Sequence, residues 1–96
     1  MDTPDLTLNE MRGLIYIHDI NQELAQPEPA TITQLSEMAE WRSKYFTDAW
    51  TSLKPRGLVD REKDGVNTRL STTDHGDKVV SLLKQLNEEL DEAENR

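Results

Sequence analysis

Residues 43–72, SKYFTDAWTSLKPRGLVDREKDGVNTRLST, decide the fold of this 96-residue chain. Within this stretch Phe46, Trp50 and Leu53 follow one another at spacings of four and three residues. That spacing puts their side chains on one face of a helix, which buries this face against the rest of the chain. The helix must stop at Pro55-Arg56-Gly57, because proline cannot continue it.

A β-hairpin follows this helix. The segments 58–62 and 67–72 have a strand-like composition and flank Lys63-Asp64-Gly65-Val66. The Asp-Gly pair supplies residues that adopt the positive φ of a tight turn. We therefore expect a two-stranded ribbon over residues 58–72.

Two further helices are predicted before the helix and hairpin of the quoted stretch. Thr7-Leu8-Asn9-Glu10 has the spacing of a capping box, in which a hydroxyl and an acid three residues later satisfy free backbone N–H groups. It predicts a helix over residues 7–26, which ends before two prolines. A second, short helix begins at Thr33. With the helix of the quoted stretch, for which Ser43 is the expected cap, it forms a helix-turn-helix over residues 33–54.

The remaining segments complete a single domain over residues 1–96. Residues 30–32 are long enough for only one pairing in a sheet. Thr73 or Asp74 caps a last helix over residues 74–94. The predicted fold is α+β and mostly α. It has the layout of a winged helix-turn-helix, with a three-helix core, a two-stranded wing and a long C-terminal helix.

The quoted stretch forms part of three spaced motifs. They are Leu35-x-x-Met38-Ala39, Phe46-x-x-x-Trp50-x-x-Leu53-x-x-x-Gly57-Leu58-Val59 and Leu70-Ser71-Thr72-Thr73-Asp74-His75-Gly76. Over residues 31–83 this framework resembles that of MarR-like and PadR-like transcriptional regulators. Trp50 stands where that framework has leucine, and Glu40-Trp41-Arg42-Ser43 stands where it has a glycine-containing turn. In its acidity the resemblance extends to winged-helix regulators of the haloarchaeal type. It implies a DNA-binding regulator.

Charge is distributed unevenly along the chain. The formal net charge is −8, with 19 acids against 11 bases, and taken alone this argues against binding nucleic acid. Residues 42–69, however, hold seven bases and four acids, a net charge of +3, whereas residues 1–41 and 70–96 carry −7 and −4. The positive segment contains the helix and hairpin with which the resembling regulators dock on DNA. The alternative is chance clustering on an ordinary solvated surface.

The outward face of the third helix is expected to enter the major groove. Opposite its buried stripe it presents one base, one acid and several hydroxyls. Lys44 can meet a phosphate or a guanine edge, and Asp48 can accept only from an amino group such as that of cytosine. The expected DNA contacts of this helix are Ser43, Lys44, Tyr45, Thr47, Asp48 and Thr51. The alternative is plain solvent exposure.

Bases at the end of that helix and on the hairpin extend the expected interface. Lys54 and Arg56 close the helix, where they contact DNA or instead complement the helix dipole. Arg61 and Lys63 are two residues apart and share one face of the ribbon. Arg69 joins that patch if the register pairs it with one of them. The wing is expected to reach the adjacent backbone or minor groove. The alternative is a solvated hairpin in which interleaved acids halve the local charge.

The last helix offers a surface for self-association. Its apolar residues follow spacings of four and three, and we expect the inner ones to pack on the domain. Leu86, Leu90 and Ala93 are expected at the seam of a homodimer, alone or together with the first helix. A two-fold dimer presents two recognition helices to half-sites about one helical turn apart. The alternative is a monomer with a solvated acidic tail.

Several function classes have no supporting pattern in this sequence. It contains no Cys, no zinc-ligand spacing, no phosphate loop and no G-x-S-x-G, and its two histidines, His18 and His75, are far apart. We therefore expect no enzyme, no metal, no cofactor and no membrane span, and a cytoplasmic location. With no sensor thiol, a signal must come through salt, a small molecule in the dimer cleft, a partner or protein abundance.

Two interpretations of the acid excess remain open. In the first, the chain is adapted to molar intracellular salt, where the Debye length is about 3 Å and remote acids scarcely repel DNA. The chain is then a sequence-specific regulator that binds double-stranded DNA. In the second, the winged helix is a protein interaction module without DNA binding, and its acidic faces meet a basic partner.

Overall fold

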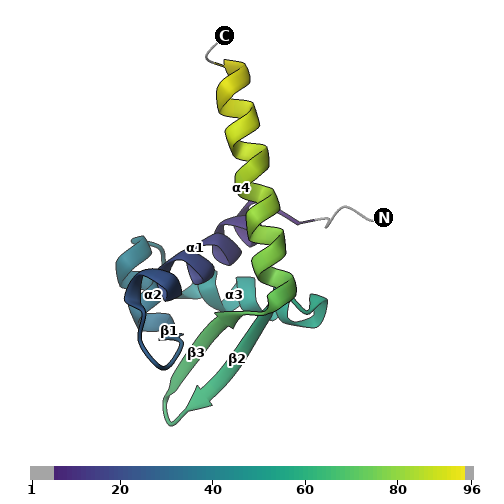
Figure 1. The fold of residues 1–96 in the computed structure, drawn as a ribbon. Helices are drawn as coiled ribbons and strands as arrows, with labels where there is room; N and C mark the ends of the chain where they lie inside the picture. The colour runs from purple at the N-terminus through teal and green to yellow at the C-terminus, as the bar shows by residue number, and fades with distance from the viewer. Residues whose placement is uncertain (1–5, 95–96) are drawn as a thin grey trace.

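The computed structural model describes residues 6–94, with side chains as far as Leu86 (Figure 1). Three helices and a small antiparallel sheet form the body, and α4 extends well beyond it. This confirms the predicted class, a mostly helical α+β winged helix-turn-helix. In chain order the elements are α1 (Leu8–Leu24), β1 (Ala30–Thr31), α2 (Ile32–Ala39), α3 (Ser43–Leu53), the 3-10 helix η1 (Lys54–Arg56), β2 (Val59–Asp64), β3 (Asn67–Thr72) and α4 (Asp74–Glu94).

The start of α1 confirms the expected capping box. The Thr7 hydroxyl accepts from the Glu10 N–H at 3.2 Å, and Glu10 Oε1 accepts from the Thr7 N–H at 2.9 Å. At the other end Ala25 adopts a left-handed φ of 47° and donates its N–H to the Asn21 carbonyl. α1 therefore ends at Leu24, two residues before the predicted end, because this left-handed residue turns the chain out of the helix.

A second capping box sets the start of α2. The Thr31 hydroxyl accepts from the Gln34 N–H at 3.1 Å, and Gln34 Oε1 accepts from the Thr31 N–H at 3.0 Å. The helix therefore begins at Ile32, one residue earlier than the predicted start at Thr33, because Thr31 supplies the cap.

The turn between α2 and α3 contains no glycine. Glu40 adopts a left-handed φ of 53°, and the Trp41 N–H donates to the Ser36 carbonyl. The Ser36 hydroxyl in turn donates to the Trp41 carbonyl. These bonds place Arg42 at the N-cap position, so Ser43 is the first helical residue and not the cap that the sequence predicted. No side-chain hydrogen bond caps α3.

The helices enclose an apolar core. Leu14 and Ile17 of α1 and Phe46 of α3 are completely buried. A fully buried side chain of this kind contributes about 1.5–3 kcal/mol to stability. The two helices approach closely at Gly13, where an added Cβ would lie 2.7 Å from the Ala49 Cβ. α1 and α3 therefore form one tightly packed unit.

The sheet is antiparallel, with strand order β1-β3-β2. A two-residue turn, in which Gly65 has a φ of 62°, pairs Asp64 with Asn67. β2 consequently continues to Asp64, two residues beyond the predicted strand end. β1 adds one short pairing with β3, as expected, in which Ala30 lies opposite Leu70 and Thr31 opposite Arg69.

Asn21 ties α1 to two strands at the base of the wing. Its Nδ2 donates to the Leu70 carbonyl of β3 at 2.9 Å and to the Ile17 carbonyl at 2.8 Å. Its Oδ1 accepts from the Ala30 N–H of β1 at 2.7 Å. The wing therefore starts from a base that is fixed to the helical core.

Thr73 caps α4, one of the two residues predicted for this role. Its hydroxyl accepts from the Gly76 N–H at 2.9 Å and donates to the Gly57 carbonyl at 2.6 Å. A Cβ at Gly76 would lie 2.1 Å from the Leu58 carbonyl oxygen, so only glycine fits this contact. Val80 is buried, and farther along the helix leaves the body of the molecule (Figure 1). None of the helices in the described range 6–94 is long and apolar enough to cross a membrane.

Candidate nucleic-acid interface

The face of α3 that points away from the core is polar. Lys44, Thr47, Asp48 and Thr51 are exposed there. The Thr47 hydroxyl donates to the Ser43 carbonyl at 3.2 Å, and the Thr51 hydroxyl donates to the Thr47 carbonyl at 2.7 Å. Because both hydroxyl protons are used within the helix, the two threonines and Asp48 present acceptors, whereas Lys44 presents donors.

Two further predicted contacts lie at the edges of this face. Tyr45 is 37% exposed, and its ring centre lies 5.2 Å from that of Trp41. With Asp48 and Glu10 it lines a hollow of about 190 Å³ next to the start of α1. Ser43 is exposed in the first turn of α3.

One buried carboxylate fastens the end of α3 to α1. Glu10 is only 9% exposed and accepts a hydrogen bond from the Ser52 hydroxyl in addition to its capping bond with Thr7. The Ser52 bond, the Thr7 bonds and the positive charge of Arg56 hold the pKa of Glu10 below its ordinary value of 4.5, although burial opposes them. Sequence reasoning assigned Glu10 only to the cap, because its partner Ser52 is distant along the chain.

The two bases that follow α3 belong to η1, which continues that helix and ends at Gly57. Gly57 has a φ of 75° and donates its N–H to the Lys54 carbonyl at 2.9 Å. Lys54 and Arg56 are both exposed where the carbonyl end of the helix carries partial negative charge. The charge of Arg56 also acts on Glu10. Contact of either base with DNA stays a prediction.

The two faces of the wing differ in composition. The register places Val59, Arg61 and Lys63 on one face, with Leu70 opposite Arg61. Val59 and Leu70 are buried, so this face turns toward the core and α3. The Arg61 guanidinium carbon lies 4.8 Å from the centre of the Trp50 ring of α3. Arg61 and Lys63 thus share a face, as expected.

Arg69 does not join that face, and the predicted pairing with Arg61 or Lys63 is wrong. It pairs with Glu62 and lies on the opposite face, because a two-residue turn sets odd-numbered residues against even-numbered ones. Its guanidinium donates to the Pro29 carbonyl at 2.8 Å and to Asp64 at 3.1 Å, and it forms an ion pair with Glu28 at 3.1 Å. The side chain is 16% exposed. Arg69 therefore joins the wing to the 27–29 loop.

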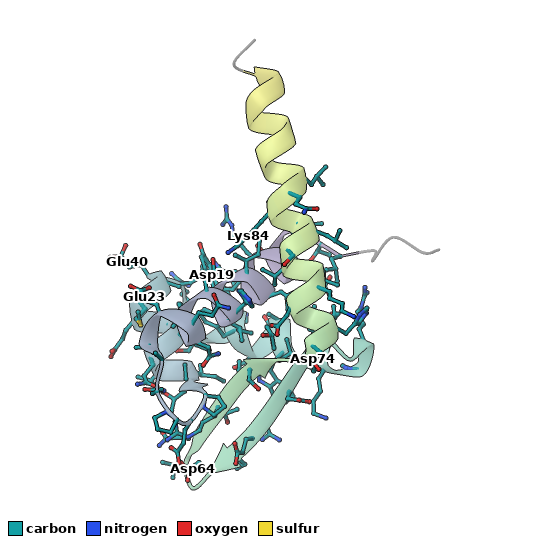
Figure 2. The ribbon with its side chains drawn as sticks, viewed as in Figure 1. Asp19, Glu23, Glu40, Asp64, Asp74 and Lys84 are labelled. Atoms are coloured by element: carbon teal, nitrogen blue, oxygen red, sulfur yellow. The ribbon has the colours of Figure 1, made fainter. Side chains whose placement is uncertain are left out.

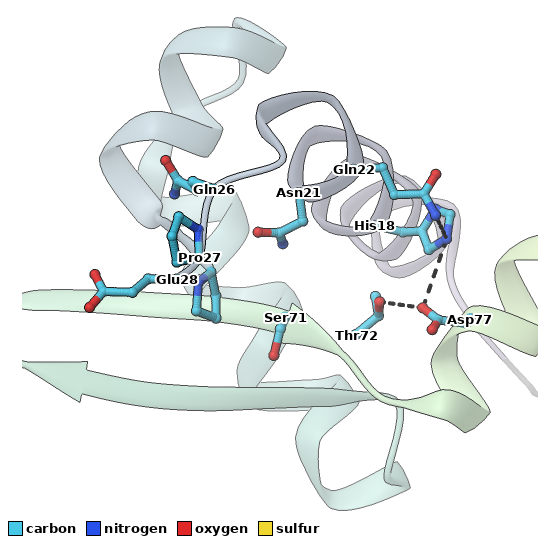
Figure 3. Close-up of a pocket in the computed structure, with 10 residues that line it drawn as sticks. His18, Asn21, Gln22, Gln26, Pro27, Glu28, Ser71, Thr72 and Asp77 are labelled. Atoms are coloured by element: carbon cyan, nitrogen blue, oxygen red, sulfur yellow. Dashed lines mark hydrogen bonds and ion pairs between the residues drawn. The ribbon is translucent and has the colours of Figure 1, made fainter.

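A polar cleft of about 310 Å³ lies between α1, residues 27–29 and β3 (Figure 3). His18 Nδ1 lies 2.8 Å from Asp19, and His18 Nε2 lies 3.8 Å from Asp77. The Asp77 carboxylate also accepts from the Thr72 hydroxyl. The cleft thus joins α1, β3 and the first turn of α4 in one polar network. Among the described residues no group of three or more His, Cys, Asp or Glu residues could hold a metal ion.

Acidic residues of α1 lie away from the wing tip. Figure 2 shows Asp19 and Glu23 on a different side of the molecule from Asp64. Asp19 accepts a hydrogen bond from Lys84 Nζ of α4 at 2.7 Å. Partial burial raises the pKa of Asp19, but hydrogen bonds from Lys84 and His18 outweigh it, and the pKa lies below its usual value.

The predicted dimer residues lie on the outer part of α4. Leu86 is 59% exposed and lines an apolar groove of about 510 Å³ between α1 and α4. The side chains of Leu90 and Ala93 lie outside the described residues. We call this feature the α1–α4 groove, and its lining residues are Leu8, Met11, Arg12, Ile15, Leu83, Lys84 and Leu86.

Solved structures with a similar fold include complexes with DNA. The chain is similar to Streptococcus pneumoniae FabT in complex with DNA, with 18% identity, coverage of 93% of this chain and 59% of that chain, and a TM-score of 0.69. It is similar to MepR in the S. aureus MepR-DNA complex, with 16% identity, coverage of 94% and 64%, and a TM-score of 0.74. For the transcriptional regulator SlyA the identity is 15%, the coverage 93% and 60%, and the TM-score 0.71.

At these identities the likeness shows the fold alone. The chain spans about three fifths of the length of these proteins. No protein-family model matches the sequence, and no curated protein matches it. The comparisons confirm the winged-helix fold and support the resemblance to MarR-like regulators at the level of that fold.

Proposed function

We propose that this chain binds double-stranded DNA as a small transcriptional regulator in the cytoplasm and has no enzymatic activity. The observation that carries the proposal is an exposed polar face of α3 beside the face of the wing that bears Arg61 and Lys63. FabT and MepR present a similar fold in complexes with DNA. Lys44, Arg61 and Lys63 supply the bases of this surface. Arg69 of the same basic segment lies on the opposite face of the wing.

In the proposed complex α3 lies in the major groove, which is about 12 Å wide. The acceptors on Thr47, Asp48 and Thr51 match the exposed amino groups of cytosine and adenine, whereas Lys44 meets a phosphate or a guanine edge. Lys63, near the wing tip, reaches the adjacent backbone or minor groove. Phosphate oxygens only accept hydrogen bonds, so the acceptors on this face can pair only with donors on the bases. We therefore propose that binding depends on the base sequence.

The proposed binding unit is a homodimer joined through the α1–α4 groove. Leu8 and Leu86 expose 68% and 59% of their surface in the single chain, and Leu82 exposes 56%. Clusters of exposed apolar side chains mark sites of protein contact. Leu90 and Ala93 are included in the proposed seam because the apolar spacing of the α4 sequence extends to them. A two-fold dimer sets two α3 helices on successive turns of DNA, and its cleft is where a small-molecule effector would bind.

A second candidate function is a winged-helix module that binds a basic protein and no DNA. The net charge of −8 favours it, because a negative molecule repels a polyanion. Adaptation to molar salt removes this objection, since the Debye length there is about 3 Å and remote acids are screened. The two candidates predict opposite outcomes in a direct binding experiment.

Selection of bound sequences from a random duplex pool, at low and at molar KCl, tests the proposal. We expect enrichment of a two-fold symmetric sequence whose half-sites are centred about 10 base pairs apart. Retention of the fold and of the dimer is checked in the same samples by circular dichroism and sedimentation. A folded dimeric sample that enriches no sequence and retains no duplex at either salt concentration would overturn DNA binding and favour the protein interaction module.

A further inference from the structure

A cation–π contact joins the wing to α3. The Arg61 guanidinium carbon lies 4.8 Å from the centre of the Trp50 ring. Within the described residues Arg61 forms no hydrogen bond or ion pair, although Asp60 and Glu62 are its neighbours in sequence. Successive side chains of β2 point to opposite faces of the sheet, so the two acids lie on the face opposite Arg61 and do not pair with it. The donors of Arg61 are therefore available to a ligand.

Hydrogen bonding does not account for tryptophan at position 50. The Trp50 Nε1 atom is buried and has no hydrogen-bond partner in the part of the chain that the structure describes. A buried N–H without a partner costs free energy, and an aliphatic side chain would avoid that cost. The indole is half-buried and one of its faces carries the guanidinium. The contact with Arg61 is thus the interaction that requires an aromatic ring.

We infer that Trp50 is a positioning residue for DNA binding, which holds the Arg61 guanidinium between α3 and the wing so that it binds one phosphate of the DNA backbone. This inference rests on the proposed function. When α3 lies in the major groove and the wing meets the adjacent minor groove, the DNA backbone that separates the two grooves passes between α3 and the wing. Arg61 lies where the wing meets α3.

The chemistry of a stacked guanidinium suits this ligand. Arginine presents a planar fork of N–H donors that matches two oxygens of a phosphate, and stacking on a ring leaves the donors at its edge free. A side chain that is already held in place loses less conformational freedom on binding. Lys63 shares the same face of the wing but has no aromatic platform within residues 6–86, so it provides a matched comparison.

The test is a double-mutant cycle of duplex affinity, measured by fluorescence anisotropy over a range of KCl concentrations. Arg61→Ala is expected to lower the salt dependence of log affinity by about 1 per protomer, as for one lost phosphate contact. Trp50→Leu is expected to weaken binding by about two- to fivefold, the value of a cation–π contact. In the Arg61→Ala background Trp50→Leu is expected to have no further effect. Trp50→Phe, which keeps a ring face, should stay within about twofold of wild type.

The matched control is the cycle of Trp50→Leu with Lys63→Ala, whose effects should multiply independently. Circular dichroism melting verifies that each variant is folded. If Trp50→Leu does not fold, Trp50→Met, which also lacks a ring face, takes its place in the cycle. If wild type binds duplex but the Trp50 and Arg61 effects are independent, or if Arg61→Ala leaves the salt dependence unchanged, the inference is wrong and the proposed function stands. If wild type binds no duplex, both are wrong.

Discussion

The α3–wing surface, formed by the outward face of α3 with Arg61 and Lys63, and the α1–α4 groove lie on one small core but expose opposite chemistry. The first presents cations and hydrogen-bonding groups, whereas the second exposes Leu8 and Leu86. A cationic polar surface suits a polyanion, and exposed apolar area suits another protein surface. The net charge of −8 therefore describes neither surface, because the chemistry of each depends on its local residues.

One helix, α1, connects these two regions. Met11 and Ile15 line the α1–α4 groove, whereas Gly13 of the same helix packs directly against Ala49 of α3. Glu10 adds a hydrogen bond from Ser52 near the end of α3. Residues that line the groove and residues that contact α3 therefore belong to the same helix.

The largest effect is expected from charges placed in the groove. Leu8→Glu combined with Leu86→Glu should convert the proposed dimer to a monomer, because a carboxylate buried in an apolar seam is strongly unfavourable. Loss of the second half-site contact should weaken duplex binding about 10²-fold or more. Analytical ultracentrifugation and anisotropy measure the two results. Gln85→Glu adds a charge on α4 outside the groove and should change neither. A variant that remains dimeric would show that the seam lies elsewhere.

Removing cations from the α3–wing surface is expected to have the next largest effect. Lys44→Ala and Lys63→Ala should each weaken binding about tenfold near 0.1 M salt and lower its salt dependence by about 1 per protomer. The dimer should be unaffected, since neither residue lines the groove. Arg69→Ala is the matched control, because that guanidinium is engaged by Pro29, Glu28 and Asp64. An equal change in salt dependence for Arg69→Ala would contradict the assignment of the two wing faces.

A smaller effect is expected at the contact that links the two regions. Gly13→Ala should lower the free energy of unfolding by about 1–2 kcal/mol, because overpacking costs about 1–3 kcal/mol and the better helix propensity of alanine returns up to about 1. Urea unfolding at neutral pH measures the change. Ala49→Gly removes the methyl group that the new Cβ would meet, so the loss should shrink in the double variant. An undiminished loss there would show that packing at Ala49 is not its cause.

Local signals allowed the fold to be predicted, whereas long-range contacts decided the details of the candidate site. The capping box at Thr7 and the hairpin turn depend on neighbouring residues. The structure shows the capping box as predicted, whereas the turn is formed by Gly65 and Val66, one residue later than the predicted Asp64-Gly65, because Asp64 still pairs with Asn67. The partners of Arg69 depend on the number of turn residues and on the placement of a loop that precedes α2. The contact of Arg61 with Trp50 likewise depends on the folded wing, because only the hairpin brings the two side chains together.

The smallest effect is expected from Glu10, the buried carboxylate that ties α1 to α3. The pKa of Glu10 is held below 4.5, so its ionised form stabilises the fold at higher pH, and this contribution is lost as the pH falls through the lowered pKa. Glu10→Gln keeps an acceptor but not the charge, and it should cost about 1 kcal/mol at pH 7 because bonds to charged groups are the stronger ones. Urea unfolding at pH 7, 5 and 3 should show the difference between the two proteins shrinking toward zero in acid. Asp19, whose pKa is also lowered, titrates in both proteins and cancels from that difference. A deficit of the same size at every pH would mean that Glu10 acts through its shape and capping bonds, and not through its charge.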